Sequence, residues 1–344
     1  MSSPAPQHDF SLRALNTFGI EARAQAYLPV DGADTLRAVR ADATLAALPR
    51  LVLGGGSNLL LTQDFAGLVL HMRGAGIEVV GEDEDFTYVR AAAGENWHGF
   101  VQWTLAQGLS GLENLSLIPG SVGAAPIQNI GAYGIELKDR FHELRAFDFA
   151  AGEVLTLDRA ACRFGYRDSV FKHELRDRAV VLDVTFALPK RWQPNANYAD
   201  VAQALQEKGF SDAAQASARD IADAVIAIRT RKLPDPAKIG NAGSFFKNPI
   251  VSAQQRDALL AQHIGLVSYR QDDGSYKLAA GWLIDRCGWK GKTMGAAGVY
   301  EKQALVLVNH GGASGADIAQ LAKAIQDDVM LKFGVALEPE PVFI

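Results

Sequence analysis

The 344-residue sequence predicts an α+β fold in at least two domains. Three observations lead to this prediction. A helical pattern precedes an apolar strand near the N-terminus, short strand-like segments recur between residues 67 and 188, and helices alternate with short strands after residue 217. A chain of this length is too long for one small core, so more than one domain is expected.

The N-terminal part begins as a helix followed by a strand. Residues 34–48 have helical apolar spacing, with Asp34 placed to cap the first turn. The apolar residues 51–53 form a strand that leads into Gly54-Gly55-Gly56-Ser57-Asn58. A helix is expected over 96–107, and the strands expected around it are 68–70, 77–80, 87–90, 143–149, 153–157 and 180–188.

Proline marks the end of this region. Pro189 and Pro194 suggest a domain boundary within residues 189–215. A helix capped by Ser217 is expected over 217–231. The elements expected beyond it are helices at 254–263, 278–287 and 316–333 and strands at 304–309 and 335–337.

The composition excludes several functional classes. A net charge of −5 argues against a general nucleic-acid binder, which needs a basic face. Cys162 and Cys287 cannot form a disulfide framework, and neither has metal-ligand spacing around it, so no metal is expected. Residues 1–10 lack the apolar core of a signal peptide, and no apolar run approaches the roughly 20 residues of a membrane span. We therefore expect a cytoplasmic protein without membrane or nucleic-acid partners.

Two glycine-rich segments are candidate ligand sites. Gly54-Gly55-Gly56 follows a strand, which is where a turn that binds phosphate through backbone N–H groups is found. The segment lacks the dinucleotide-binding fingerprint, and a simple turn explains it about equally well. Residues 118–134 are also rich in small side chains and carry Ser121 and Asn129. Together they suggest one large ligand, such as a dinucleotide, whereas a structural loop is the alternative for the second segment.

The segment Gly240-Asn241-Ala242-Gly243-Ser244-Phe245-Phe246-Lys247-Asn248-Pro249 presents a hydroxyl among small residues. Ser244 is a candidate nucleophile, proton donor or phosphate contact, and a tight turn before a strand is the simpler alternative. No convincing Ser–His–acid arrangement accompanies it, which favours the proton-donor role.

Charged residues elsewhere have simple explanations on their own. Arg167, beside Asp168, is either a surface ion pair or an arginine that stabilises an anion. Glu338 and Glu340 share one face of an extended segment, and a solvated tail is the commoner reading. A local excess of basic residues in the C-terminal part would suit a phosphorylated substrate or a solvated surface: Arg229, Arg231, Lys232, Lys238, Lys247, Lys290 and Lys292.

Taken in order, these segments resemble the UDP-N-acetylenolpyruvoylglucosamine reductases, flavoenzymes of bacterial peptidoglycan precursor synthesis. The resemblance covers nearly the whole chain. The residues that carry it are 16–20, 53–60, 116–134, 165–169, 231–234, 240–249, 279–285 and 337–340.

The resemblance implies an FAD-binding region of vanillyl-alcohol-oxidase (PCMH) type over 1–205, with subdomains of about 1–72 and 73–205. A C-terminal α/β domain over 206–344 would bind the UDP-sugar and return its last residues to the flavin site. FAD would be held noncovalently, in a chain expected to be monomeric. The residues implied for it are Gly54, Gly55, Gly56, Ser57, Asn58, Ile118, Pro119, Gly120, Ser121, Gly123, Ala124, Asn129, Tyr133 and Arg229.

The same resemblance implies the reaction. NADPH would reduce FAD, and flavin N5 would then pass hydride to the enolpyruvyl group of UDP-N-acetylglucosamine enolpyruvate, which gives UDP-N-acetylmuramate. Arg167 and Glu340 would stabilise the enolate-like species, and Ser244 would protonate it. Glu338 remains the alternative to Glu340, because the chain ends soon afterwards, at Ile344. The residues implied for the substrate are Tyr198, Lys232, Asn248 and Tyr269, the last typical of a subtype with a mobile tyrosine loop.

Two other functions stay open at this point. The same fold would suit an FAD-dependent oxidase of a small alcohol or sugar, although no covalent attachment residue is evident beside the glycine-rich segments. A nonenzymatic nucleotide-sugar-binding protein would instead be colourless, since it would carry no flavin.

Overall fold

The computed structural model describes residues 5–344, and the chain forms two compact units. Unit 1 contains the described residues up to Phe10 together with Ala24–Gly56 and Phe65–Arg231, and unit 2 contains Ser11–Arg23, Ser57–Asp64 and Lys232–Ile344. The predictions that begin at residue 1, the FAD-binding region and the absence of a signal peptide, fall partly outside the described residues.

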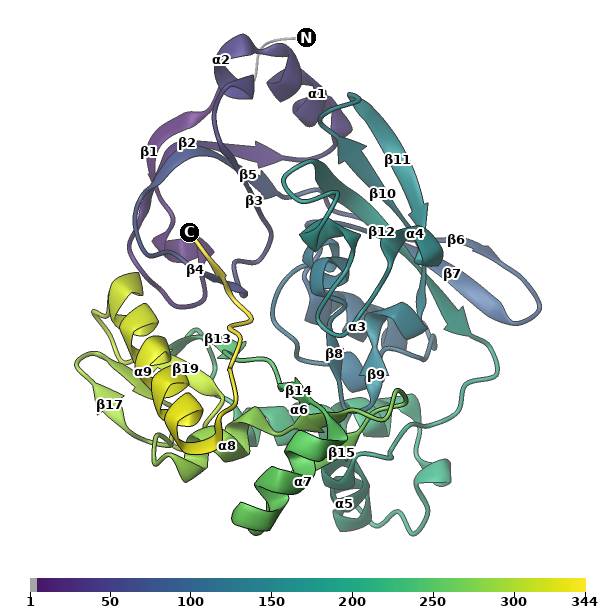
Figure 1. The fold of residues 1–344 in the computed structure, drawn as a ribbon. Coiled ribbons are helices and arrows are strands. Elements are labelled where there is room, and N and C mark those ends of the chain that lie inside the picture. The colour runs from purple at the N-terminus through teal and green to yellow at the C-terminus, as the bar shows by residue number, and fades with distance from the viewer. Residues whose placement is uncertain (1–4) are drawn as a thin grey trace. The chain divides into compact units, whose positions relative to one another are not determined.

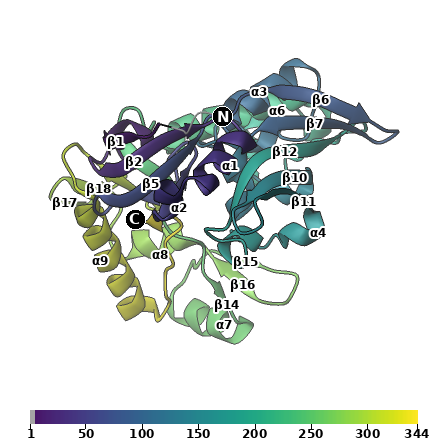
Figure 2. The same cartoon turned by 90° about the horizontal axis from the view of Figure 1, so that it is seen from above.

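Unit 1 contains two sheets. In the first, of order β1-β2-β5-β3, strands β2, β5 and β3 run parallel. The second is antiparallel, of order β11-β10-β12-β7-β6, and its strands lie side by side in Figure 2. The strands are β1 (Gln7–Ser11), β2 (Arg23–Val30), β3 (Arg50–Leu53), β5 (Phe65–Met72), β6 (Ile77–Glu82), β7 (Phe86–Ala92), β10 (Phe141–Asp148), β11 (Glu153–Asp158) and β12 (Ala179–Pro189).

Helices α1, α2 and α3 pack against these sheets through apolar side chains, and their places in the fold can be followed in Figure 1. Leu36, Val39 and Leu45 of α1 and α2 are buried with apolar residues of β2 and β5, and Trp97 and Phe100 of α3 are buried in a second cluster with Phe186 of β12. The α-helices of unit 1 are α1 (Ala33–Ala41), α2 (Ala43–Ala46), α3 (Trp97–Ala106), α4 (Arg159–Cys162), α5 (Ala199–Glu207) and α6 (Ala218–Lys232, whose last residue belongs to unit 2).

The glycine-rich part of unit 1 is folded into short elements. The segment that the sequence suggested as a ligand loop contains a 3₁₀-helix, η3, with Val122, Ala125 and Pro126 buried. Small residues therefore pack closely here. The elements are η2 (Glu113–Leu115), η3 (Val122–Gln128), β8 (Gly131–Ala132), β9 (Ile135–Glu136), η4 (Leu137–Asp139), η5 (Val170–Lys172) and η6 (Ala213–Gln215).

Unit 2 is built around an antiparallel sheet of order β13-β19-β18-β17, which helix α9 contacts. A three-stranded sheet, β14-β16-β15, and a parallel pair, β20-β4, complete it. The elements are η1 (Arg13–Leu15), β4 (Leu59–Leu60), β13 (Gly240–Ser244), β14 (Ile250–Val251), α7 (Ala253–Gln262), β15 (Ser268–Arg270), β16 (Tyr276–Leu278), α8 (Ala280–Arg286), β17 (Thr293–Met294), β18 (Ala297–Val299), β19 (Val306–Asn309), α9 (Gly315–Phe333) and β20 (Val342–Phe343).

The expected mixture of helices and strands is confirmed, with three local corrections. The helix expected over 34–48 is two helices, because Asp42 is extended and its carboxylate accepts hydrogen bonds from the N–H groups of Thr44 and Leu45. Residues 335–337 are not a strand, and a helix, α5, occupies part of the expected boundary region. Within residues 5–344, no helix combines the length and apolarity that crossing a membrane requires.

Candidate active site

Ser244 lies at the end of β13, where pairing with β19 becomes irregular. The register shifts between Asn241 and Ser244, and Gly243 has a φ of +70°, a conformation that favours glycine. The Asn241 side-chain oxygen accepts a hydrogen bond from Gly243 N–H at 2.9 Å. Phe245 and Phe246 are buried, whereas Ser244 is exposed. The irregular strand end thus presents one hydroxyl beside a buried apolar segment.

The C-terminal segment runs beside Ser244 in the same unit. Glu340 N–H donates to Phe245 C=O at 2.8 Å, and Lys247 N–H donates to Glu338 C=O at 2.9 Å. Glu340 is half-buried, whereas Glu338 is exposed and its carboxylate forms an ion pair with Lys247 Nζ. The fold therefore brings the backbones of Ser244 and Glu340 together.

Asn58 holds the same C-terminal segment from the other side. Its Nδ2 donates to Glu340 C=O at 3.3 Å, and its own C=O accepts from Val342 N–H at 3.0 Å. The pairing continues as the parallel strands β4 and β20. The segment Ser57-Asn58, predicted to bind a cofactor, is therefore also what fixes the position of Glu340.

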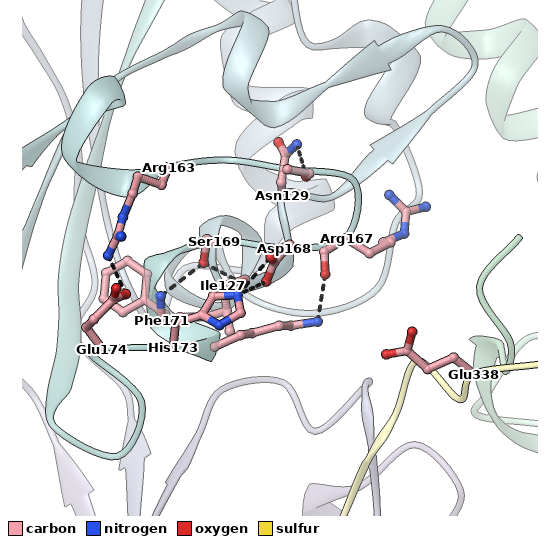
Figure 3. A network of polar contacts seen from close by, with 12 residues as sticks. Ile127, Asn129, Arg163, Arg167, Asp168, Ser169, Phe171, His173, Glu174 and Glu338 are labelled. Atoms are coloured by element: carbon pink, nitrogen blue, oxygen red, sulfur yellow. Dashed lines mark hydrogen bonds and ion pairs between the residues drawn. The ribbon is translucent and has the colours of Figure 1, made fainter. Parts of the chain in front are cut away.

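Arg167 lies in a tight turn of unit 1 with a φ of +54°, which is unusual for a residue with a side chain (Figure 3). Its guanidinium Nη2 donates to Gly131 C=O at 3.1 Å and lies over the Tyr166 ring. Asp168 pairs with His173, 2.8 Å away. The carboxylate beside Arg167 in sequence is thus engaged by a histidine.

Asn129, predicted to contact the cofactor, is fully buried. Its Nδ2 donates to Gly165 C=O and to the Glu136 carboxylate, both at 3.0 Å, and its Oδ1 accepts from Lys138 N–H at 3.0 Å. An amide with both N–H groups and its oxygen engaged has little capacity left for a ligand. Its side chain instead ties the glycine-rich segment to the turn that carries Arg167.

Gly54 and Gly55 pass very close to the second glycine-rich segment. A Cβ on Gly55 would lie 2.8 Å from Gly120 Cα, and one on Gly54 would overlap Ser121 Oγ. Among the described residues, Ser121 Oγ is buried without a hydrogen-bond partner. These positions need glycine for close backbone approach, and the paired segments form a backbone-lined cradle with one unsatisfied hydroxyl.

Leu117, just before that cradle, is also left-handed, with a φ of +60°. Arg229 Nε donates to Leu117 C=O at 3.2 Å, and Leu117 N–H donates to His98 Nδ1 at 3.0 Å. Burial lowers the pKa of the Arg229 guanidinium, and burial followed by the Arg229 charge lowers the pKa of His98. Both effects favour the neutral form of His98, which its acceptor role requires.

Tyr133 and Tyr198, predicted for cofactor and substrate respectively, lie together in unit 1. Their rings are edge to face at 5.3 Å. Burial raises the pKa of the Tyr133 hydroxyl, which is hydrogen-bonded to Arg229. The two tyrosine rings thus lie beside the buried Arg229 guanidinium, which the Tyr133 hydroxyl contacts.

The remaining residues predicted to bind substrate lie in unit 2. Lys232 is the last residue of α6, and Asn248 Oδ1 accepts a hydrogen bond from Ala280 N–H at 3.0 Å, at the start of α8. Tyr269 is half exposed on β15, next to the turn at residues 271–275.

Comparison with known proteins agrees with this arrangement. Residues 24–158 match an FAD-binding domain family, and residues 235–344 match the C-terminal domain of UDP-N-acetylenolpyruvoylglucosamine reductase. The chain is 61% identical over 333 residues to the UDP-N-acetylenolpyruvoylglucosamine reductase of Paraburkholderia phytofirmans, covering 97% of this chain and 96% of that protein. The chain belongs to the UDP-N-acetylenolpyruvoylglucosamine reductase family.

One further relative supports this assignment, and one solved structure shares the fold. The chain is 59% identical to the UDP-N-acetylenolpyruvoylglucosamine reductase of Burkholderia mallei over 334 residues, 97% of this chain and 96% of that protein. The fold matches the crystal structure of the reductase from Thermus caldophilus with a TM-score of 0.69, at 24% identity and 99% coverage of both chains.

The predicted activity is therefore confirmed. The protein is an FAD-dependent reductase of UDP-N-acetylenolpyruvoylglucosamine, with NADPH as reductant, in peptidoglycan precursor synthesis. The expected pairing of an FAD-binding domain with a C-terminal domain of this family is confirmed as well. Neither the oxidase nor the nonenzymatic alternative is supported, because the relatives are reductases.

The residues of this chain fit FAD in the part of unit 1 where the glycines meet. Backbone exposed by Gly54, Gly55 and Gly120 suits a pyrophosphate, and the unpartnered Ser121 hydroxyl can donate to one of its oxygens.

Sequence reasoning missed the residues that support this site. His98 accepts a hydrogen bond from Leu117 N–H, Lys172 donates to Arg167 C=O, and Asn114 donates to Tyr133 C=O. All three lie outside the segments that carry the family resemblance. Asn114 Nδ2 donates to the C=O groups of Tyr133 and Asn195, both at 2.9 Å. No pattern in the sequence marks such contacts, because each joins a side chain to a backbone atom that only the folded turn or loop brings within reach.

Proposed function

We propose that Ser244 is the proton donor of the reductase reaction, and that Arg167 and Glu340 stabilise the negative charge that precedes protonation. FAD, reduced by NADPH, supplies the hydride that adds to the methylene carbon of the enolpyruvyl group. Charge then develops on the adjacent carbon and its carboxylate. A fixed guanidinium stabilises such an enolate, and Glu340 does so as a protonated hydrogen-bond donor, since a second carboxylate would repel it.

The observation that carries this proposal is the irregular end of β13. It exposes Ser244 directly before the buried Phe245, whose C=O accepts a hydrogen bond from Glu340 N–H. A serine hydroxyl is a weak acid, so it suits a strongly basic carbon acceptor. Glu338 is less suited to the catalytic role, because its carboxylate is exposed and paired with Lys247.

The proposal assigns the binding residues as the family resemblance implied, with one change. The FAD contacts are Gly54, Gly55, Gly56, Ser57, Asn58, Ile118, Pro119, Gly120, Ser121, Gly123, Ala124, Tyr133 and Arg229, whereas Asn129 supports the loop through its buried side chain. Tyr198, Lys232, Asn248 and Tyr269 bind the UDP-sugar. Residues 1–205 form the FAD-binding region and residues 206–344 the substrate domain of a cytoplasmic monomer.

Replacement of Ser244 tests the proton-donor role. Ser244→Ala should leave reduction of the bound flavin by NADPH within twofold of the parent. It should slow flavin reoxidation by the enolpyruvyl nucleotide by about 10²- to 10⁴-fold, the usual contribution of a positioned general acid. Stopped-flow absorbance near 450 nm separates the two half-reactions.

The matched control is Ser211→Ala, which removes the hydroxyl of an exposed serine outside the site and should change neither half-reaction. Equal losses in both half-reactions of Ser244→Ala would refute the donor role, because reduction by NADPH needs no proton on the substrate carbon.

A further inference from the structure

Arg167 is held in its left-handed conformation by contacts that the catalytic proposal does not use. The turn is closed by hydrogen bonds between Gly165 and Asp168, N–H to C=O, at 3.0 and 3.4 Å. A left-handed conformation is unfavourable for a residue with a side chain, so this turn persists only if its surroundings stabilise it.

Lys172 supplies one of those contacts directly to Arg167. Its Nζ donates to the Arg167 C=O at 2.8 Å, from the end of the short helix η5. A hydrogen bond from an ammonium group is stronger than a neutral one. The Lys172 ammonium binds the carbonyl oxygen of Arg167 itself, so it fixes the peptide group that follows the Arg167 Cα, the atom that carries the side chain.

The other contacts hold the ends of the turn. Asn129 binds Gly165 C=O, and His173 binds the Asp168 carboxylate. Ser169, which follows the turn, donates to Ile127 C=O at 2.7 Å. Each of these contacts fixes a neighbour of Arg167, whereas the bond from Lys172 acts on Arg167 directly.

We propose that Lys172 is a positioning residue for the reductase reaction, which holds Arg167 so that its guanidinium meets the developing enolate. This inference rests on the proposed role of Arg167. Lys172 itself need not contact the substrate. Its loss would let the turn relax and move the guanidinium, and small misplacements of a catalytic group are costly to rate.

Three substitutions at one position separate positioning from general stability. Lys172→Met keeps the apolar stem and removes the donor, and should slow flavin reoxidation by the enolpyruvyl nucleotide about 10-fold while reduction by NADPH stays within twofold. Lys172→Arg keeps a cationic donor and should restore the reoxidation rate to within about threefold of the parent. Lys172→Gln should fall between them.

A matched control shows whether the effect belongs to this contact. Lys190→Met makes the same change at a lysine paired with Glu82 elsewhere in unit 1, and should leave both half-reactions unchanged. Hydrogen–deuterium exchange of peptides covering residues 163–172 should quicken in Lys172→Met and stay at the parent rate in Lys190→Met. Unchanged exchange in Lys172→Met would overturn the inference.

A double variant separates failure of this inference from failure of the proposed function. Because Lys172 acts through Arg167, the variant Arg167→Ala with Lys172→Met should reoxidise no more slowly than Arg167→Ala alone. Slow Arg167→Ala with normal Lys172→Met would overturn only the positioning role. A normal reoxidation rate in Arg167→Ala would remove the catalytic role of Arg167 and the positioning role together.

Discussion

Left-handed backbone marks the candidate site at the scale of single residues. Leu117, Asn129, Tyr133 and Arg167 all have positive φ values, from +45° to +60°, although each carries a side chain. Conformations of this kind persist where surrounding contacts over-determine them, and they concentrate at functional sites. The sequence predicted three of these four residues as site residues, but not their conformation, because φ depends on partners that only the fold supplies.

Asp148 provides a pH-dependent prediction. It is 1% exposed at the end of β10, and the Arg178 guanidinium, followed by backbone N–H groups, lowers its pKa to about 2. Because the folded pKa lies below the unfolded value of about 3.8, the ion pair contributes stability above pH 3.8 and loses it as the pH falls toward 2. Asp148→Asn should lower the free energy of unfolding at pH 7 by about 1–2 kcal/mol.

Urea unfolding of the holoenzyme followed by circular dichroism, at pH values between 7 and 3, checks this effect. The difference between parent and Asp148→Asn should shrink as the pH falls below 3.8. Asp34→Asn disrupts the exposed pair with Arg37 and should cost less than about 0.5 kcal/mol. A difference for Asp148→Asn that is independent of pH would contradict the ion-pair explanation.

His98 gives a second prediction, on flavin affinity. His98→Ala removes the acceptor for the partly buried Leu117 N–H, and an unsatisfied donor costs up to about 1–3 kcal/mol where water is excluded. If the proposed FAD contacts are right, the apoprotein should bind FAD about 5- to 100-fold more weakly, measured by quenching of flavin fluorescence. Because the folded pKa of His98 is lowered, parent affinity should hold above pH 6.5 and fall only at lower pH, where protonation of Nδ1 removes the acceptor.

His71 is the matched control. Burial also lowers the pKa of His71. Its ring is hydrogen-bonded to the Tyr27 hydroxyl at 2.8 Å, whereas the His98 ring is bonded to Leu117 N–H. His71→Ala should therefore leave FAD affinity nearly unchanged. Equal weakening by both substitutions would mean that general loosening of unit 1, rather than the support of Leu117, sets the affinity.

At the scale of elements, periodicity predicted long helices well and capping details poorly. The apolar stripe of residues 316–333 gives α9, whose N-cap Ser314 and Asp317 bind each other's backbone N–H groups. Asp42 broke the expected helix at 34–48, since an aspartate can either continue a helix or cap the next one. Strands of two or three residues, such as β20, carry too short a pattern to be recognised, because their pairing is set by distant segments.

Strand β20 gives the prediction for this scale. Ile344 N–H donates to Leu60 C=O at 3.0 Å, and Ile344 C=O accepts from Thr62 N–H at 2.8 Å and from its hydroxyl at 2.7 Å. Deletion of residues 341–344 removes these bonds and the contact of Phe343 with Phe245, which should lower stability by about 3 kcal/mol. Flavin reoxidation should also slow, because Glu340 would then be the last residue of the chain, without β20 to fix the segment that follows it.

Ile344→Ala keeps the backbone of β20 and serves as the comparison. It should retain most of the stability and the reoxidation rate, measured by thermal unfolding and stopped-flow absorbance. A deletion variant with the reoxidation rate of the parent would show that β20 does not hold Glu340 for catalysis.

At the scale of the whole molecule, the two units are not simple halves of the sequence. The sequence predicted a boundary between residues 189 and 215, where prolines interrupt the pattern, whereas unit 1 continues to Arg231. Unit 2 also includes Ser11–Arg23 and Ser57–Asp64. Composition and periodicity report only neighbouring residues, so they cannot assign a short segment to a distant unit. The resemblance did mark both places, through residues 16–20 and 53–60, without showing what they pack against.

These two segments supply core contacts to unit 2. Asn241 N–H donates to Thr17 C=O at 2.9 Å, and Asn309 Nδ2 donates to Phe18 C=O at 3.0 Å. Phe18 is 1% exposed, and Leu60 and Leu61 are 0% and 2% exposed. Each buried apolar side chain of this size contributes about 1.5–3 kcal/mol, a large share of the net stability of a small domain.

We therefore expect residues 232–344 alone not to fold cooperatively. Their heteronuclear NMR spectrum should show poor dispersion, and thermal unfolding should show no sharp transition, because β20 lacks its partner β4 and the site of Phe18 is empty. Co-expression with residues 1–231, which carry both segments, should restore dispersion and a cooperative transition. A sharp transition in the isolated fragment would mean that its own contacts suffice and that the two inserted segments only cover its surface.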